Sequence, residues 1–243
     1  LRNRVFLATK VSPQNYRRAD LLRSVDASLG RLGVDVIDLL QLHEPNRAIP
    51  IQETLQTVAD LIDAGKVRYA GVSNFSAPQL DQARQALGRH PVVSNQVRYN
   101  LIDRTVEPDV LPYCRAHSVT VIAYCPLARG LDRIRDCDPT DVVGEIARTT
   151  GKSPAQVALN WVLCQEGVVA IPKGNSEQHV LDNCGASGWR LSPEQMALIE
   201  SRIRYRRRTR LDELARRYLP RPLQAAVSRG VRFLPPALRR RVH

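Results

Sequence analysis

Residues 69–74 read YAGVSN, a short apolar run that ends on two polar residues, Ser73 and Asn74. Five further runs share this design, and each closes on a polar or charged residue: VFLATK at Lys10, VIDLLQLH at His43, VVSNQ at Gln96, VTVIAY at Tyr124 and VVAIPK at Lys173. Every gap but the last holds one amphipathic helical pattern. Strands that alternate with helices predict a parallel α/β barrel, whose functional groups lie at the carboxyl ends of its strands.

A closed barrel of this kind needs eight strands, and the sequence offers six. We expect strands at 4–10, 36–42, 69–72, 92–96 and 119–124, and a sixth in the run that ends at Lys173. Capping-box patterns that begin at Ser153 and Ser192 predict two of the helix starts. The chain opens on Leu1 rather than Met, which suggests a shortened N-terminus. The predicted fold is therefore an eight-stranded (β/α) barrel with about six units present.

Composition bounds the class of protein. Hydrophobic residues make up 43% of the 243 positions and aromatic residues only 5%, so the core is predicted to be aliphatic. No apolar run approaches the roughly 20 residues of a membrane span. The five cysteines show no CxxC spacing, which favours reduced thiols in a cytoplasmic protein over a disulfide framework or a metal site.

The positive charge is concentrated in one segment. Residues 202–243 hold 14 arginines and two acidic residues, a net +12 that equals the charge of the whole chain. We therefore expect a neutral partial barrel over 1–201 and an Arg-rich amphipathic extension over 202–243. A solvated extension, or a helix that covers the bottom of the barrel, is the favoured interpretation, ahead of contact with an anionic membrane surface or an acidic partner. Nucleic acid ranks third because aromatic residues are sparse there, and no specific nucleic acid is expected.

The strand ends carry groups suited to chemistry on a small molecule. Lys10 follows apolar residues and should be partly desolvated, which favours close pairing with an acidic partner. Lys10 and His43 together could form a proton-transfer pair. Lys173 offers a point charge for a phosphate beside Gly174. The remaining strand ends offer a ring face and groups for a planar amide: Tyr124, and Ser73, Asn74 and Gln96.

Over roughly residues 1–201 the chain resembles the aldo-keto reductases. Six segments carry the resemblance in matching order and spacing: ATK at 8–10, LLQLHEP at 39–45, GKVRYAGVSNF at 65–75, SNQVRYN at 94–100, YCPLARG at 124–130 and IPKGNSEQHVLDN at 171–183. The resemblance implies a (β/α)₈ barrel that binds an extended nicotinamide dinucleotide without a Rossmann motif. It also implies hydride transfer that reduces an aldehyde or ketone to an alcohol.

The family uses four catalytic residues, Asp, Tyr, Lys and His, and the resemblance supplies two of them here. Lys10 matches the lysine that lowers the pKa of the tyrosine, and His43 matches the histidine that orients the carbonyl. The family's Asp and Tyr lie on a segment before the lysine. Tyr16 follows Lys10 at a helix start and Tyr69 begins a strand, so neither is expected to replace the acid.

The resemblance also assigns a cofactor site. The nicotinamide carboxamide is held by residues that match Ser73, Asn74 and Gln96, and the ring stacks on the residue that matches Tyr124. The loop that crosses the pyrophosphate is matched by Leu127, Arg129 and Gly130. The adenosine end is matched by the remaining residues: Lys173 and Gly174, and Gln178, His179 and Asn183. Relatives often carry Ser or Thr where Gly174 stands and Arg where His179 stands. The expected cofactor is NADPH, with NADH as the alternative.

Three functions follow as hypotheses. The leading one is an NADPH-dependent carbonyl reductase in its full-length form, with a small carbonyl compound as substrate. The alternative is a nicotinamide-nucleotide-binding module or regulatory subunit with impaired catalysis, because the acid is missing. The third is a basic surface-binding protein in which the barrel is a relic.

Overall fold

The computed structural model describes residues 2–206, so the part of the predicted extension from residue 207 onward lies outside the described residues. Its centre is one six-stranded sheet in the order β1 to β6, and every neighbouring pair is parallel. The strands are β1 (Ala8–Val11), β2 (Ile37–Leu42), β3 (Val67–Ser73), β4 (Val92–Arg98), β5 (Thr120–Tyr124) and β6 (Val168–Ile171). The prediction of six parallel strands is confirmed.

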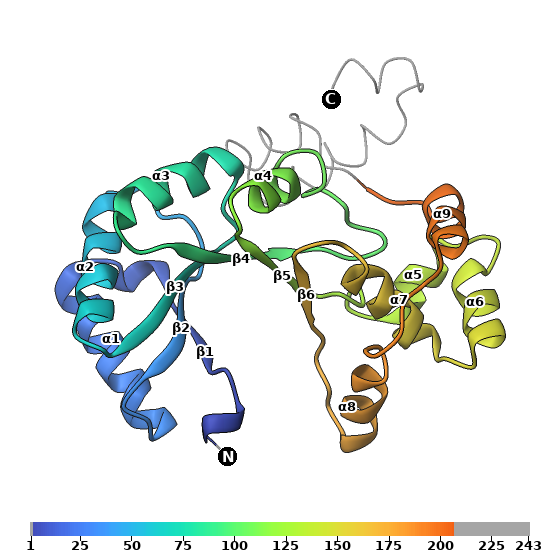
Figure 1. The fold of residues 1–243 in the computed structure, drawn as a ribbon, viewed down its shortest axis with the longest axis horizontal. Coiled ribbons are helices and arrows are strands. Elements are labelled where there is room, and N and C mark those ends of the chain that lie inside the picture. The colour runs from blue at the N-terminus through green and yellow to red at the C-terminus, as the bar shows by residue number, and fades with distance from the viewer. Residues whose placement is uncertain (1, 207–243) are drawn as a thin grey trace.

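Helices fill the connections and pack outside the arc of strands (Figure 1). One α-helix joins each of the first four strands to the next: α1 (Arg18–Leu32), α2 (Ile51–Asp63), α3 (Ala77–Leu87) and α4 (Val110–Ala116). The last connection holds α5 (Leu131–Arg135), α6 (Val142–Thr150) and α7 (Pro154–Leu163), and α8 (Glu177–Cys184) and α9 (Pro193–Arg202) follow β6. Because all strands run the same way, their carboxyl ends lie at one edge of the sheet.

Local sequence accounts for several helix boundaries. The capping boxes predicted at Ser153 and Ser192 are both formed, and Ser76 forms a third with Gln79. Each places a serine oxygen on an otherwise unpaired backbone N–H of the first turn. Gly33 ends α1 with a φ of 63°, a left-handed conformation that glycine adopts without steric cost.

Two details differ from the prediction. The first strand begins at Ala8 rather than at residue 4, because residues Arg2–Arg4 form a short 3₁₀ turn, η1. The Arg2 guanidinium donates to the Val5 carbonyl at 3.1 Å and to the Val36 carbonyl at 2.9 Å, which holds this turn against the start of β2. The short helices α5 and α8 were not predicted: α5 has only five residues, too few to show a helical period, and α8 buries none of its residues.

The strand register aligns inward-facing residues in rows. Lys10 pairs with Gln41, Gln41 with Gly71, and Gly71 with Ser94, so one row crosses four strands. The next row toward the carboxyl edge begins with Ser73 and Gln96. Residues two apart on a strand share a face. These two rows therefore stack above one another on the concave face of the sheet.

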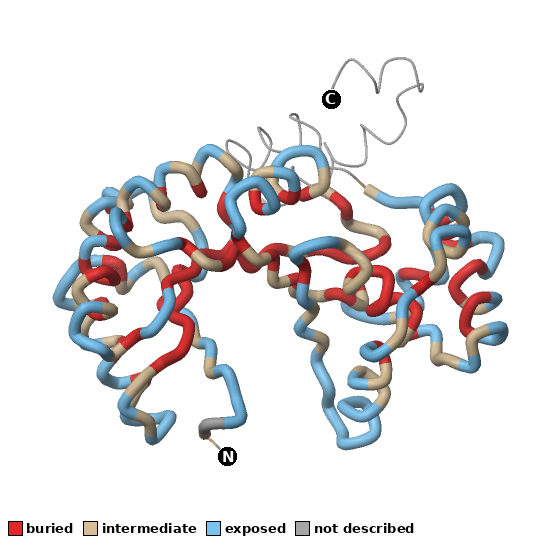
Figure 2. Tube along the Cα trace, in the orientation of Figure 1, coloured by how far each residue is buried: buried red, intermediate tan, exposed pale blue. Residues whose placement is uncertain are grey.

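The hydrophobic core lies between the sheet and the helices, and Figure 2 shows much of the strands as buried. Among the described residues, β1 and β6 are the two ends of the sheet and do not pair with each other. Apolar side chains near these ends and on the concave face stay exposed, with Phe6 at 62%, Tyr69 at 45% and Ile171 at 45%. Within residues 2–206, no helix combines the length and apolar character needed to cross a bilayer.

The last described residues return to the barrel. The Arg206 N–H donates to the Ile102 carbonyl at 3.0 Å, and the Arg104 N–H donates to the Arg206 carbonyl at 3.1 Å. The guanidinium of Arg104 lies between the rings of Trp161 and Tyr205, at 4.4 and 4.2 Å from their centroids. Such cation–π contacts are stronger when desolvated, and Arg104 is buried. This stack fastens the chain after α9 to the loop after β4.

Candidate functional site

A chain of hydrogen bonds crosses the concave face at the carboxyl ends of the strands. Lys10 Nζ on β1 donates to Gln96 Oε1 on β4 at 2.8 Å. Gln96 Nε2 donates in turn to Gln41 Oε1 on β2 at 3.2 Å. Gln96 and Gln41 are buried, whereas Lys10 is exposed. The amide of Gln96 is thus held at both ends below an open rim.

A second set of bonds joins the neighbouring strand ends to the same residue. Ser73 Oγ donates to the Gln96 carbonyl at 2.8 Å, and Asn74 Nδ2 donates to Ser73 Oγ at 3.1 Å. Asn74 Nδ2 also lies 3.3 Å from the His43 carbonyl, and Tyr124 Oη donates to Asn74 Oδ1 at 3.1 Å. Six of the residues predicted from sequence therefore belong to one network that spans β1 to β5.

Asn74 owes its place in this network to its backbone. Its φ is 61°, in the left-handed region that asparagine tolerates better than most residues. The Asn74 N–H donates to the Gln96 carbonyl at 2.9 Å, which fixes the turn directly after β3. The amide side chain can then reach both His43 on one side and Tyr124 on the other.

The partner of Lys10 differs from the expectation. We expected an acidic group, and the structure gives the neutral amide of Gln96. Although much of the Lys10 side chain is exposed, partial desolvation of its ammonium lowers the pKa of Lys10 below its ordinary value of 10.5. An amide oxygen satisfies one ammonium proton without offsetting the cost of desolvating the charge. Two further donor positions of the ammonium point elsewhere and can serve another group.

The structure places neither tyrosine near Lys10 in a way that suits an acid. Tyr16 is buried, and its hydroxyl donates to the Glu44 carbonyl at 2.8 Å. Burial is the main reason that the pKa of Tyr16 rises to about 12. Tyr69 lies in the middle of β3 and stacks on Phe6, with ring centroids 6.2 Å apart. Tyr69 does not begin the strand as the sequence predicted, because β3 starts at Val67.

The loop after β5 carries the next group of predicted residues. Leu127 packs partly against the core, while Arg129 and Gly130 are exposed. Ala128 and Arg129 both have positive φ values, 56° and 70°. Consecutive left-handed residues are costly, and they concentrate at ligand-binding loops. Asn100 Nδ2 donates to the Cys125 carbonyl at 3.0 Å and holds the start of this loop.

The residues predicted for the adenosine end form a separate group. Ile171 pairs with Tyr124 across β5 and β6, so Lys173 leaves the sheet beside the network. Lys173, Gly174, Gln178 and His179 are exposed, and Asn183 is half-buried. Ser176 caps α8 by accepting from the His179 N–H at 3.2 Å. The pairing of β5 with β6 joins this group to the network. We call the segment that carries it, residues 173–183, the exposed arm.

Sequence reasoning missed Gln41, which is 1% exposed and bonds directly to Gln96. A signal was present, because Gln41 is a polar residue in the middle of an otherwise apolar stretch, two positions before His43. The alternation of a strand places it on the face that carries Lys10 and Gln96.

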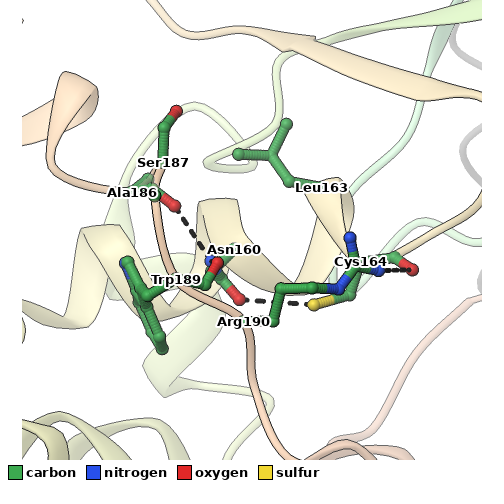
Figure 3. Close-up of a pocket in the computed structure, with 8 residues that line it drawn as sticks. Asn160, Leu163, Cys164, Ala186, Ser187, Trp189 and Arg190 are labelled. Atoms are coloured by element: carbon green, nitrogen blue, oxygen red, sulfur yellow. Dashed lines mark hydrogen bonds between the residues drawn. The ribbon is translucent and has the colours of Figure 1, made fainter.

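A cavity of about 380 Å³ lies away from this site, between the end of α7 and the chain after α8 (Figure 3). Asn160 dominates its wall: Nδ2 donates to the carbonyls of Ala186 and Trp189, both at 2.9 Å. Its Oδ1 accepts from the Leu191 N–H at 2.9 Å and from Cys164 Sγ at 3.3 Å. Because these polar groups bond one another, they hold α7 to the chain after α8, and the cavity lies within this structural connection.

With this geometry established, comparison with known proteins identifies the family. The Aldo/keto reductase family model matches residues 1–204. The chain belongs to the aldo/keto reductase family. Methylglyoxal reductase YeaE of Escherichia coli is 37% identical over 201 residues, which cover 82% of this chain and 70% of that protein. Aldo-keto reductase YhdN of Bacillus subtilis is 34% identical, with 79% of this chain and 68% of that protein covered.

Solved aldo-keto reductases share the fold. The thermostable enzyme Tm1743, crystallised with the inhibitor epalrestat, superposes with a TM-score of 0.77 at 39% identity, covering 83% of this chain and 72% of that one. An aldo/keto reductase from Klebsiella pneumoniae in complex with NADP and acetate gives 0.76 at 38% identity, covering 86% and 73%. The six-stranded sheet is therefore part of the aldo-keto reductase barrel, as predicted, and the chain is a member of an oxidoreductase family.

Proposed function

We propose that this aldo-keto reductase binds NADPH and, in its full-length form, reduces an aldehyde or ketone to an alcohol. The observation that carries the proposal is the single network that joins Lys10, His43, Ser73, Asn74, Gln96 and Tyr124. The Klebsiella pneumoniae relative was crystallised with NADP and, separately, with NADPH, which supports the choice of cofactor.

The donors and acceptors of Gln96 fit a nicotinamide carboxamide. A primary amide carries two N–H donors and an oxygen with two lone pairs. Lys10 uses one lone pair and Gln41 uses one N–H, so one position of each kind remains for a ligand. Another carboxamide needs this combination of donor and acceptor. Because Gln96 is 6% exposed, its orientation is fixed before the ligand arrives.

NADPH supplies a hydride when it is bound, and the chain's own residues would orient the reaction. Asn74 and Gln96 would hold the carboxamide, while the half-buried ring of Tyr124 would support the nicotinamide face. His43 follows β2 directly, and its N–H donates to the Val11 carbonyl at 3.1 Å. It would bind the substrate carbonyl oxygen beside Lys10, whose ammonium favours a developing negative charge.

The exposed arm after β6 would bind the other end of the cofactor. Lys173 would face the 2′-phosphate, and Gln178, His179 and Asn183 would contact the adenosine. The loop with Leu127, Arg129 and Gly130 would cross the pyrophosphate. A cationic side chain followed by a short helix capped by Ser176 suits an anionic group.

A second function is favoured by the bonding of Lys10. Its ammonium donates to Gln96, which we place in the cofactor site. Tyr16 instead bonds the Glu44 carbonyl, and Tyr69 stacks on Phe6. General acid catalysis contributes about 10²–10⁴-fold to such reactions. A chain that binds the nucleotide without an acid would act as a nucleotide-responsive module or regulatory subunit.

One experiment separates the two functions. NADPH fluorescence is titrated with the full 243-residue chain, and its consumption is then followed with a reactive aldehyde such as methylglyoxal. Binding without consumption by this chain favours the module. Binding with consumption supports the reductase and would show that the family's tyrosine is not essential for turnover. A chain that binds neither NADPH nor NADH would overturn both.

We also propose a division of the chain into a partial barrel over 1–201 and an Arg-rich extension over 202–243, in a cytoplasmic protein. The extension would be solvated, with an anionic surface or acidic partner as its alternative contact. Retention on anionic liposomes and on DNA is compared for the full chain and for a chain ending at residue 206. Equal retention would remove the extension from any binding role.

A further inference from the structure

We infer that Gln41 is a positioning residue: it fixes the amide orientation of Gln96, and through it the groups that the site presents to a carboxamide. The inference deepens the proposed function and rests on it for the identity of the ligand. It rests on the structure alone for the geometry.

The polarity of the chain Lys10–Gln96–Gln41 begins at the ammonium. A lysine ammonium can only donate, so the atom of Gln96 that lies 2.8 Å away must be the amide oxygen. The amide nitrogen of Gln96 then faces Gln41 at 3.2 Å, and Gln41 must present its oxygen to accept. If either side-chain amide were rotated by 180°, two donors or two acceptors would face each other at a buried position.

The row beneath Gln96 leaves room for this arrangement. Gln41, Gly71 and Ser94 are register neighbours, and all three are buried. A Cβ at Gly71 would lie 2.3 Å from Ser94 Oγ, 3.1 Å from Leu39 Cδ1 and 3.2 Å from Gln41 Cγ, so a larger residue would displace these side chains.

Two polar atoms of this row also remain unpaired. Gln41 Nε2 and Ser94 Oγ are buried and have no hydrogen-bond partner among residues 2–206. A buried amide nitrogen without a partner is costly. Despite this cost in free energy, the Gln41 oxygen stays oriented toward Gln96.

Two substitutions isolate this role. Gln41→Met keeps the length and volume of the side chain and removes the acceptor, whereas Gln41→Glu keeps an acceptor oxygen at the same reach. The matched control is Leu39→Met, which changes a buried residue on the same strand and the same face without touching a polar group. Thermal unfolding of each variant reports whether it folds.

The first readout needs no cofactor. In the wild-type chain, the side-chain amide of Gln96 is assigned by NMR, and the exchange of its two protons with solvent is measured. One proton should exchange slowly because Gln41 holds it, and Gln41→Met should abolish the difference while Leu39→Met preserves it. Equally fast exchange of both protons in the wild type would overturn the inference, whether or not NADPH binds.

The second readout is NADPH affinity. Gln41→Met should weaken binding about tenfold, the effect of losing one buried hydrogen bond, and Gln41→Glu should restore it to within about threefold of wild type. Equal affinity of wild type and Gln41→Met would overturn the inference. A wild-type chain that shows slow exchange at Gln96 but no NADPH binding would instead overturn the proposed function.

Discussion

The amino ends and the carboxyl ends of the strands use polar groups in different ways. At the amino end, the Asp38 carboxylate of β2 is 1% exposed and lies 2.8 Å from the Arg2 guanidinium and 2.6 Å from that of Arg68. It also accepts from the Leu7 N–H at 2.8 Å. At the carboxyl end, the amides and hydroxyls around Gln96 are mostly neutral, and several keep unused donors and acceptors.

The difference separates stability from binding. The Asp38 oxygens bond Arg2 of η1, Leu7 just before β1 and Arg68 of β3. Asp38 therefore links these elements at the amino ends of the first strands. The network at Gln96 is also held in place, but the Gln96 amide keeps one donor and one acceptor position for a ligand. In parallel α/β barrels, the carboxyl end of the strands carries the site and the amino end contributes stability. Substitutions at each end test this division.

The largest effect is expected from Gln96→Leu. The change removes the amide that we place on the nicotinamide carboxamide, and it leaves Lys10 and Gln41 without their shared partner. NADPH affinity should fall about 100-fold, equivalent to about 2.7 kcal/mol. Fluorescence titration measures the affinity, and urea unfolding measures the free energy of unfolding in parallel.

The division between the ends predicts which quantity changes more in this variant. Binding should lose more free energy than folding, because the leucine still fills the space of the glutamine. A variant that unfolds more easily yet binds NADPH as wild type does would place Gln96 with Asp38 among the structural residues.

The next effect is expected from Asp38→Asn. The substitution removes the charge that pairs with Arg2 and Arg68, and it should lower the free energy of unfolding at pH 7 by about 2 kcal/mol. The figure is modest because Arg68 is largely exposed and its ion pair is screened by water. NADPH affinity should remain as in wild type. A weakened NADPH affinity at an unchanged free energy of unfolding would contradict the division, because it would assign Asp38 to binding rather than to stability.

Acid should erase the advantage of wild type over Asp38→Asn. The hydrogen bond from Arg2 is the main cause that holds the pKa of Asp38 below its ordinary value of 3.8. The folded protein therefore keeps this carboxylate ionised to lower pH than the unfolded chain does. Its stabilisation is complete above the unfolded pKa and is lost as the pH falls through the folded pKa. Urea unfolding at pH 7, 5 and 3 should show the two proteins converging only at the lowest pH.

Much of this organisation was readable from sequence. Apolar runs that end on polar residues located the strands and the rim, because side-chain period and strand length are local properties. The partner of Lys10 was not readable, since Lys10 and Gln96 are 86 positions apart and meet only when β1 to β4 curve. The helix α8 escaped prediction because an exposed helix needs no apolar stripe. The role of Asp38 was not readable either, because its two arginine partners, Arg2 and Arg68, come from two other elements of the chain.

A smaller effect is expected from Lys173→Met on the exposed arm. The ammonium is exposed, so its contact with a 2′-phosphate is worth about 1 kcal/mol or less. NADPH affinity should fall about fivefold at low salt and less at high salt, while NADH affinity should not change. Lys66→Met is the matched control, since Lys66 pairs with Asp26 before β3. An equal loss of NADPH and NADH affinity would show that Lys173 does not read the phosphate.

The smallest effect is expected from Gly174→Ser, which restores the residue type that relatives often carry after the lysine. A Cβ at Gly174 would lie 2.6 Å from Val180 Cγ2 and 3.3 Å from the Val180 N, so the valine must rotate away. Val180 is 49% exposed and has room to do so, and the clash with a side chain should nearly cancel the gain of a hydroxyl donor.

The double variant Gly174→Ser/Val180→Ala removes the clash and should bind NADPH about threefold more tightly than wild type, the effect of roughly one weak hydrogen bond. Val180→Ala alone is the control and should bind as wild type does. Affinity is again measured by fluorescence titration, with NADH as the comparison ligand. If the double variant gains nothing for NADPH, residue 174 does not face the phosphate. The exposed arm would then contribute less to binding than the network at Gln96 by an even wider margin.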